Sequence, residues 1–182
     1  MNDHKTAIIG GSFNPPTFAH MKLIEMSKLT NYDRVIIAPV YQHPFGKDLI
    51  DIKHRINMLN IAIDLLGLPD SVNIEVVDVE KKMYGFHQNN FTVNLVNYYY
   101  SPEPDRNITL IVGSDSIEYL SKWHKYEELC EMVNFKVMPR NNSISSTSVR
   151  DLIKKNKNYK LWLGQAVPEE IIAYIEEHNL YR

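Results

Sequence analysis

Short apolar runs alternate along the chain with segments in which apolar residues recur every three to four positions. The first pattern is typical of strands buried on both faces, and the second is typical of helices with one buried face. Together they predict strands over 6–11, 34–40, 72–79, 107–113 and 134–140, and helices over 20–29, 52–66, 91–100, 123–133, 145–155 and 168–178. Because the two alternate, we expect an α/β fold with a Rossmann-like parallel sheet of about five or six strands and helices on both faces.

The length and composition indicate a single domain over 1–182. A chain of 182 residues with 44% hydrophobic residues can bury a sizeable core, and no apolar run approaches the roughly 18 residues that a membrane span needs. The formal net charge of −2 gives no general affinity for nucleic acid or for a membrane surface. The single cysteine, Cys130, rules out an internal disulfide framework and agrees with a cytoplasmic location, and its apolar neighbours predict a buried thiol.

Four loops that follow predicted strands carry glycine, hydroxyl or basic residues. Their sequences are GGSFNPPTFAH (10–20), YQHPFGK (41–47), GSD (113–115) and ISSTSVR (144–150). In a parallel sheet such loops open at the edge formed by the carboxyl ends of the strands, where ligands bind. A strand that runs into a glycine turn and then into a helix is typical of a phosphate site. The four loops therefore predict one shared site for phosphate groups.

The first loop supplies several of the expected donors. Gly10 and Gly11 allow the backbone to take positive φ and to bring its N–H groups against a ligand that a Cβ would keep away. Thr17 and His20 are the side-chain donors of this loop. A histidine at a helix start is by itself more often a cap or a solvated side chain, so the glycine turn before it is what favours a functional role.

Residues from two other loops extend the predicted phosphate site. Lys47 is a flexible point charge that suits a phosphate oxygen. Ser145, Ser146 and Thr147 precede a helix, so their N–H groups and hydroxyls face the same point as the positive end of the helix dipole. Arg150 lies one turn further on and can reach the same anion with a bidentate fork. In isolation, Lys47 and Arg150 would be read as surface charges.

Two of the loops match longer signatures. GGSFNPPTFAH is similar to the pattern G-G-[ST]-F-[DN]-P-x-[HT]-x-x-H, and ISSTSVR is similar to I-S-S-T-x-[IV]-R. Three further segments stand between and after them, namely GKDLIDIKHRINMLNIA, IVGSDSIEYLSKWHKYEEL and VPEEIIAYIEEHNLY. In this order, over nearly the whole chain, the segments resemble the nicotinamide/nicotinate mononucleotide adenylyltransferases of the nucleotidyltransferase superfamily. Ala19 stands where many relatives have glycine, which predicts a slightly more crowded phosphate site, and Asn14 in place of aspartate is a familiar form.

The resemblance implies transfer of AMP from ATP to the 5′-phosphate of a pyridine mononucleotide, with release of pyrophosphate and no covalent enzyme intermediate. It implies Mg²⁺ held mainly by substrate phosphates, with no metal site built from protein ligands. The implied catalytic residues are His20, Lys47 and Arg150. The implied ATP-binding residues are Gly10, Gly11, Ser12, Phe13, Thr17, His20, Gly113, Asp115, Ser145, Ser146, Thr147 and Arg150. The implied mononucleotide-binding residues are Ser12, Phe13, Lys47, Thr92 and Trp123.

Several alternatives stay open. Asp115 can serve as a helix cap as well as a ligand, Trp123 can be core instead of a platform for the pyridine ring, and Arg55 is expected to be structural. Other functions are a phosphopantetheine adenylyltransferase-like enzyme or a catalytically weak nucleotide-binding regulatory module. A class I tRNA synthetase is disfavoured, since the chain is short and lacks a K-M-S-K-S loop. The sequence does not choose between nicotinate and nicotinamide, and it is compatible with a homo-oligomer.

Overall fold

The computed structural model describes residues 5–28, 32–42, 46–68, 73–83, 91–100, 107–139, 145–155 and 160–182. The strands are β1 (Lys5–Gly11), β2 (Arg34–Pro39), β3 (Asn73–Val76), β4 (Asn107–Gly113) and β5 (Asn134–Met138). The helices are α1 (Phe18–Lys28), α2 (Ile52–Leu65), α3 (Val79–Met83), α4 (Thr92–Tyr100), the 3-10 turn η1 (Ser114–Ser116), α5 (Ile117–Leu120), α6 (Tyr126–Met132), α7 (Ser146–Lys155), α8 (Lys160–Leu163) and α9 (Glu169–Glu177).

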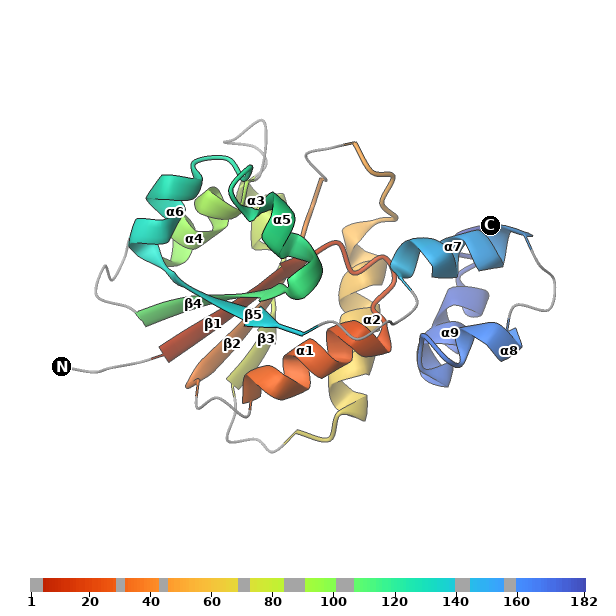
Figure 1. Cartoon of the computed structure of the whole chain (residues 1–182). Helices are drawn as coiled ribbons and strands as arrows, with labels where there is room; N and C mark the ends of the chain where they lie inside the picture. The colour runs from red at the N-terminus through yellow and green to blue at the C-terminus, as the bar shows by residue number, and fades with distance from the viewer. Residues whose placement is uncertain are drawn as a thin grey trace.

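The five strands form one parallel sheet in the order β3-β2-β1-β4-β5 (Figure 1). β1 lies at the centre, where Ile8 pairs with Ile36 of β2 and with Leu110 of β4. A strand with neighbours on both sides and helices on both faces has no solvated side, so its sequence is a continuous apolar run. The Rossmann-like α/β fold expected from the sequence is confirmed.

The two faces of the sheet carry separate apolar layers. Ile8, Ile36 and Leu110 pack with side chains of α4 and α6 on one face. On the other face, Ile9 and Ile37 pack with side chains of α1 and α2. Neighbouring residues of β1 point to opposite faces, as the two-residue period of a strand requires. Both layers are visible in Figure 1, with α4 and α6 on one side of the strands and α1 and α2 on the other.

The last three helices form a further apolar cluster beyond α2. Side chains of α2, α7 and α9 meet there, joined by Met21 of α1 and by Tyr181 near the C-terminus. Figure 1 shows α7, α8 and α9 together at the end of the molecule that is far from the N-terminus. Because α2 packs against the sheet and also against this cluster, it connects the two parts of the chain. The single domain expected over 1–182 stays a prediction.

The structure corrects several element boundaries. β3 is shorter than the strand expected over 72–79, and the short segments α3 and α8 were not expected. The helix expected from residue 123 begins only at Tyr126, because Lys125 before it has a left-handed backbone with φ of 53°. Cys130 is exposed, so the expectation of a buried thiol is wrong. It follows the fully buried Leu129 by one residue, and one helical step of about 100° turns it toward solvent.

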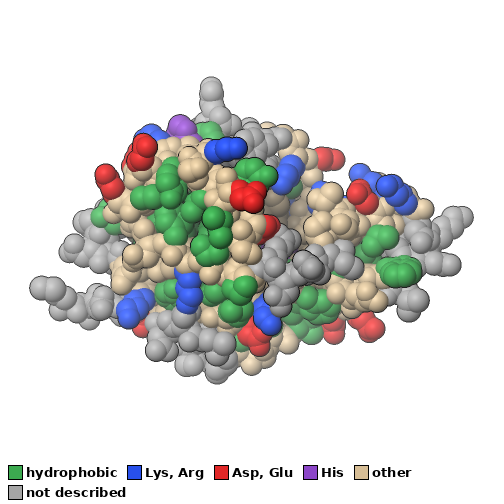
Figure 2. All heavy atoms as spheres, in the orientation of Figure 1, with side chains coloured by type: hydrophobic (Ala, Val, Ile, Leu, Met, Phe, Trp, Pro, Cys, Tyr) green, Lys and Arg blue, Asp and Glu red, His purple; other side chains and the backbone are tan. Residues whose placement is uncertain are grey.

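Apolar side chains also reach the surface near the edge of the sheet. Ile117 and Tyr119 of α5 and Val137 of β5 are exposed, and Figure 2 shows hydrophobic side chains on this face. Scattered groups of this kind are common on protein surfaces. Within the part of the chain that the structure describes, none of the helices has both the length and the apolar character needed to cross a membrane.

Candidate active site

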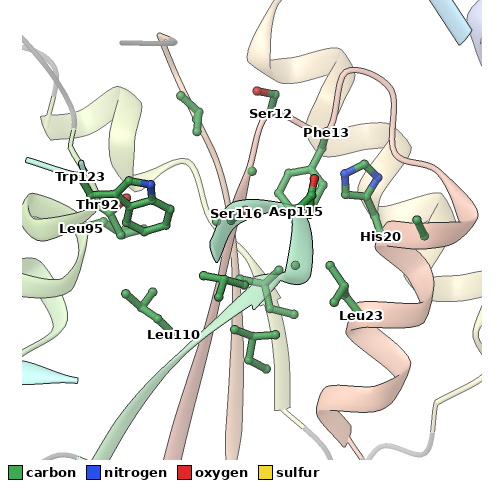
Figure 3. A pocket seen from close by; sticks show the side chains of 18 of the residues that line it. Ser12, Phe13, His20, Leu23, Thr92, Leu95, Leu110, Asp115, Ser116 and Trp123 are labelled. Carbon is green, nitrogen blue, oxygen red and sulfur yellow. The ribbon is translucent and has the colours of Figure 1, made fainter. Parts of the chain in front are cut away.

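A cavity of about 730 Å³ opens where the first loop, the end of β4 and the residues before α6 meet (Figure 3). We call it the main cavity. It is lined by nine of the residues that the sequence predicts for the site, which are Gly10, Gly11, Ser12, Phe13, His20, Thr92, Gly113, Asp115 and Trp123. These residues lie up to 113 positions apart in the sequence, and the parallel sheet brings them together at the carboxyl ends of β1 and β4.

The backbone of the first loop has its positive φ at a residue other than glycine. Positive φ is found at Phe13, with φ of 46°, and neither Gly10 nor Gly11 uses the positive φ that glycine allows. The need for glycine at position 11 is steric, since a Cβ there would lie 3.1 Å from the Phe13 ring. The Phe13 side chain turns back into the core, with 1% of its surface exposed, and its ring covers Gly11.

Thr17 holds the His20 ring in a defined state. The Thr17 N–H donates to Nδ1 of His20 at 3.0 Å, and the Thr17 hydroxyl lies 2.8 Å from the same nitrogen. Because a backbone N–H can only donate, Nδ1 accepts and the proton of the neutral ring is on Nε2. The Phe13 ring meets the imidazole edge to face at 5.1 Å. His20 therefore presents Nε2–H as its donor in a ring orientation fixed by two neighbours.

Thr17 itself is almost completely buried, with 1% of its surface exposed, and it does not line the main cavity. The structure thus places its hydroxyl against His20, and a direct contact of Thr17 with ATP stays a prediction.

Gly113 and Asp115 show a close approach at the end of β4. A Cβ on Gly113 would lie 2.5 Å from Oδ1 of Asp115, so only glycine allows the carboxylate to fold back over the strand end.

The far wall of the main cavity is aromatic and apolar. Figure 3 shows Trp123 beside Thr92 and Leu95, across the cavity from His20 and Phe13. Trp123 is half-buried and packs against the apolar layer that covers one face of the sheet. Its indole therefore belongs partly to the core and partly to the cavity wall, and its role as a platform for the pyridine ring stays a prediction.

The signature around α7 contacts the first loop and does not line the main cavity. The Ser146 hydroxyl donates to the Pro15 carbonyl at 2.8 Å. Nη1 of Arg150 donates to the Asn14 carbonyl at 2.7 Å, and its Nη2 donates to Oγ1 of Thr147 at 3.3 Å. Part of the fork expected for an anion is thus bonded to protein. The Ser145 hydroxyl accepts from the Ser148 N–H. For Ser145, as for Ser146, Thr147 and Arg150, binding of ATP stays a prediction.

Lys47 is exposed and does not line the main cavity. It is tied to the first loop through its neighbour, since Nδ2 of Asn14 donates to the Asp48 carbonyl at 3.2 Å. Oδ1 of Asn14 accepts from the Tyr181 hydroxyl at 3.0 Å. The structure therefore connects the segment of Lys47 and Asp48 to the first loop through Asn14, and contact of Lys47 with a substrate phosphate stays a prediction.

The sequence analysis missed a buried carboxyl group in the cavity wall. Glu80 lines the main cavity, has 4% of its surface exposed and accepts the Tyr41 N–H at 2.9 Å. Burial raises the pKa of Glu80 to about 7, against the lowering effects of the Tyr41 N–H and of Arg55. The sequence signal that could have identified Glu80 is its place a few residues after the end of β3. Lys122 and His124 also line the cavity beside Trp123, and His124 stacks on Phe91 at 4.2 Å.

The donor set bears on the metal that the resemblance implies. Among the described residues, no group of three or more histidine, cysteine, aspartate or glutamate side chains is arranged to hold a metal ion. Mg²⁺ commonly keeps several waters and is bound through phosphates with one or two carboxylates. The residues present therefore fit a Mg²⁺ ion carried by substrate phosphates, with the carboxylate of Asp115 at the cavity wall.

Fold and site together define a nucleotidyltransferase-type protein: a parallel sheet whose first loop, histidine and glycine turn face one cavity. The family described as cytidylyltransferase-like matches residues 8–159 of the chain. The match covers most of the chain and includes the first loop, the end of β4 and α7. The chain belongs to this family.

Relatives of the chain narrow the class. It is 30% identical over 201 residues to the probable nicotinate-nucleotide adenylyltransferase of Streptococcus mutans, which covers 100% of this chain and 90% of that protein. It is 31% identical over 206 residues to the protein of the same name from Lactococcus lactis, covering 100% and 97%. Within the larger family, the chain is thus a member of the nicotinate/nicotinamide mononucleotide adenylyltransferases.

Solved structures agree with the fold. A putative nicotinate-nucleotide adenylyltransferase from Vibrio parahaemolyticus superposes with a TM-score of 0.76 at 25% identity, covering 98% of this chain and 96% of that one. The nicotinic acid mononucleotide adenylyltransferase of Plasmodium falciparum, complexed with NaAD, superposes with a TM-score of 0.78 at 21% identity, covering 98% and 97%. The second likeness concerns the fold alone.

Proposed function

We propose that the protein transfers the AMP moiety of ATP to the 5′-phosphate of nicotinate mononucleotide, forming the dinucleotide and pyrophosphate. One observation carries the proposal: the glycine-containing first loop presents His20 on one wall of the main cavity, and Trp123 lies on the opposite wall. A donor on one side and a flat aromatic surface on the other suit a phosphate and a pyridine ring. The similarity to nicotinate-nucleotide adenylyltransferases over the full chain supports the same reaction.

The chemistry needs no protein nucleophile. A phosphate oxygen of the mononucleotide, already ionised, attacks the α-phosphorus of ATP in line with the bond to the β-phosphate oxygen. That bond breaks, and its electron pair leaves with pyrophosphate. The protein contributes alignment of two anions and donors for the charge that develops. Nε2–H of His20 is positioned for such a donor role by Thr17, and Lys47 and Arg150 are proposed to supply positive charge.

Mg²⁺ is part of the proposal. When bound to the triphosphate, it neutralises charge on the phosphate oxygens and on the departing pyrophosphate. The chain would then need to hold the nucleotide and its metal together, and Asp115 in the cavity wall could contribute a carboxylate there.

Nicotinate is proposed as the acceptor base over nicotinamide. The two differ by a carboxylate against an amide, and the curated relatives named above act on the nicotinate form by name. Trp123 is flanked by Lys122, which is cationic, and by His124, which is ionisable. Both flanking residues line the same cavity. Positive charge near the ring favours the base that carries a carboxylate.

The experiment is a coupled pyrophosphate assay with ATP and four acceptor conditions: nicotinate mononucleotide, nicotinamide mononucleotide, 4′-phosphopantetheine and none. We expect pyrophosphate release with a pyridine mononucleotide, faster with the nicotinate form, and only when a divalent ion is present. Release with phosphopantetheine alone would favour the alternative enzyme. Nucleotide binding without release in any condition would favour the regulatory module. An equal rate with EDTA in excess would contradict the role given to Mg²⁺.

We also propose that the protein is cytoplasmic and that it forms a homo-oligomer. The single, exposed Cys130 agrees with a reducing compartment, where a free surface thiol persists. Cell fractionation tests the location, and sedimentation velocity tests the oligomeric state.

A further inference from the structure

Arg55 is a charged side chain placed entirely inside the molecule. It lies on α2, has 1% of its surface exposed and is among the largest fully buried side chains. Burial lowers the pKa of its guanidinium, against the raising effects of Tyr181, Glu80 and Asp51. Burying an arginine is costly unless its donors are satisfied, so the partners of Arg55 indicate what its position achieves.

The partners of Arg55 are backbone carbonyls from three loops around the site. Nη1 donates to the Ser12 carbonyl at 3.0 Å and to the Val40 carbonyl at 2.6 Å, and Nε donates to the Ile50 carbonyl at 3.0 Å. These carbonyls belong to the first loop, to the loop after β2 and to the segment before α2. One rigid guanidinium therefore fixes three segments that are far apart in the sequence.

The bond to Ser12 determines which way the next N–H points. In a planar trans peptide, the carbonyl of one residue and the N–H of the next point in opposite directions. Arg55 does not line the main cavity, whereas Ser12 and Phe13 do. With the Ser12 carbonyl directed at Arg55, the Phe13 N–H is directed to the cavity side. Among the described residues, this N–H has no hydrogen-bond acceptor.

The conformation of Phe13 itself requires support. Its φ of 46° lies in the left-handed region, which a side chain with a Cβ rarely adopts. Such residues persist where surrounding structure holds them, and they cluster at ligand sites. Packing of the Phe13 ring over Gly11 and the bond from Arg55 to Ser12 hold the two sides of this residue.

The loop after β2 is clamped in the same way. The peptide between Val40 and Tyr41 donates its N–H to Glu80 at 2.9 Å and accepts from Arg55 at 2.6 Å. An arginine and a glutamate thus hold the two opposite edges of one peptide plane. The Val40–Tyr41 peptide, to which Arg55 ties the first loop, is therefore itself held on both edges.

We propose that Arg55 is a positioning residue for the transfer reaction: by holding the Ser12 carbonyl, it keeps the Phe13 N–H turned into the main cavity as a donor to substrate. The inference rests on the proposed function for the identity of the substrate. A lysine at position 55 retains the charge but carries its N–H donors on a single nitrogen, which cannot bond three separate carbonyls in the geometry of the fork. The Phe13 peptide is then free to rotate away.

The first test compares Arg55→Lys with a matched control, Arg34→Lys. Arg34 also forms a fork, to Glu75 at 2.7 and 3.1 Å, but it stands at the start of β2, at the opposite edge of the sheet. Both variants are assayed at equal distances below their own melting temperatures. We expect Arg55→Lys to lower kcat/KM by at least about tenfold and Arg34→Lys to leave it within about twofold. Equal losses in both variants would show that Arg55 acts on stability alone and would overturn the proposal.

The second test reads the Phe13 amide directly and needs no turnover. ¹⁵N-labelled wild-type protein is titrated with ATP without divalent ion and, separately, with nicotinate mononucleotide, with the amide of Gly67 in the turn after α2 as an internal control. We expect the Phe13 amide resonance to move downfield with at least one ligand while that of Gly67 stays. The shift should be smaller in Arg55→Lys. A Phe13 amide that neither ligand moves overturns the proposal, even if Arg55→Lys does not fold.

The two tests separate this inference from the proposed function. If wild-type protein releases no pyrophosphate with either mononucleotide, the proposed reaction fails, and the amide titration still reports whether Phe13 donates to a nucleotide. If the reaction proceeds and the amide does not move, the role of Arg55 alone is rejected.

Discussion

A single hydrogen bond decides the chemical state of His20. The Thr17 N–H reaches Nδ1 at 3.0 Å and can only donate, so the imidazole accepts there and donates from Nε2. A donor at the cavity wall is useful to a reaction in which negative charge accumulates on phosphate oxygens. The sequence could predict that His20 is functional, but the contact that fixes its tautomer depends on the folded loop.

We predict that His20→Ala lowers kcat/KM by on the order of a hundredfold or more, because a donor aimed at developing charge is lost. Thr17→Val should have a smaller effect of about two- to tenfold, the range that the net worth of one hydrogen bond implies, since the backbone N–H still holds Nδ1. Steady-state kinetics with both substrates checks this order. Near-wild-type turnover of His20→Ala, with its melting temperature unchanged, would remove His20 from the catalytic set.

Trp123 is the residue for which core and site roles must be separated. Its indole is half-buried and faces Phe13 and His20 across the main cavity. A pyridinium ring gains roughly 0.5 to 2 kcal/mol from an indole face, depending on desolvation. Trp123→Ala should therefore raise KM for the mononucleotide by about threefold to thirtyfold with little change for ATP, and Trp123→Phe should fall between. Equal changes in both KM values, or loss of folding, would assign Trp123 to the core.

At the scale of elements, the contact between α7 and the first loop joins the two signatures of the sequence. Arg150 and Ser146 bond the carbonyls of Asn14 and Pro15, across 136 and 131 positions. No local pattern predicts such a contact, because it depends on how α7 packs against the sheet-bound part of the chain. The sequence indicated that both segments serve one site, and the structure adds that each supports the geometry of the other.

Arg150→Ala should weaken ATP binding more than mononucleotide binding, because α7 follows the serine-rich turn assigned to the triphosphate. In the structure, Nη1 of Arg150 is bonded to the Asn14 carbonyl, and Nη2 makes only a long bond of 3.3 Å to Thr147. The guanidinium therefore keeps N–H donors that can reach an anion. Arg150→Lys should recover part of the loss, as a point charge replaces the fork incompletely. Separate KM values for the two substrates check the division, and equal increases would contradict it.

Strands were predicted more successfully than helix boundaries, for a physical reason. β1, β2 and β4 are buried on both faces, so burial alone gives each a continuous apolar run. The start of α6 depends on a left-handed Lys125, and the four short segments α3, η1, α5 and α8 have too few residues for a periodic signal. Their positions depend on the surrounding loops.

For the whole molecule, strand order explains which part of the site was predictable. β1 and β4 are neighbours, so the first loop and the turn at Gly113 must lie together once a parallel sheet is assumed. Glu80 and Arg55 could not be assigned to the site in this way. Glu80 enters the cavity wall from α3, and Arg55 reaches three loops from α2, so both depend on packing between elements.

Glu80 also connects the site to the stability of the folded chain. Burial raises its pKa from an ordinary value of 4.5 to about 7. Between these values the folded protein binds more protons than the unfolded chain, so the contribution of Glu80 to the free energy of unfolding falls as pH rises. This destabilising contribution is complete above about pH 7 and vanishes below pH 4.5.

Glu80→Gln removes the titration while keeping an oxygen that can accept the Tyr41 N–H. We expect the variant to exceed wild type in free energy of unfolding by up to about 3 kcal/mol at about pH 8, and to match it at acid pH. Urea unfolding across this pH range measures the difference. Glu75→Gln is the control of opposite sign: the hydrogen bond from Arg34 lowers the pKa of Glu75, so that variant should be less stable at neutral pH and approach wild type on acidification. A Glu80→Gln difference that is constant with pH, or that grows as pH falls, would show that the buried carboxyl does not titrate as described.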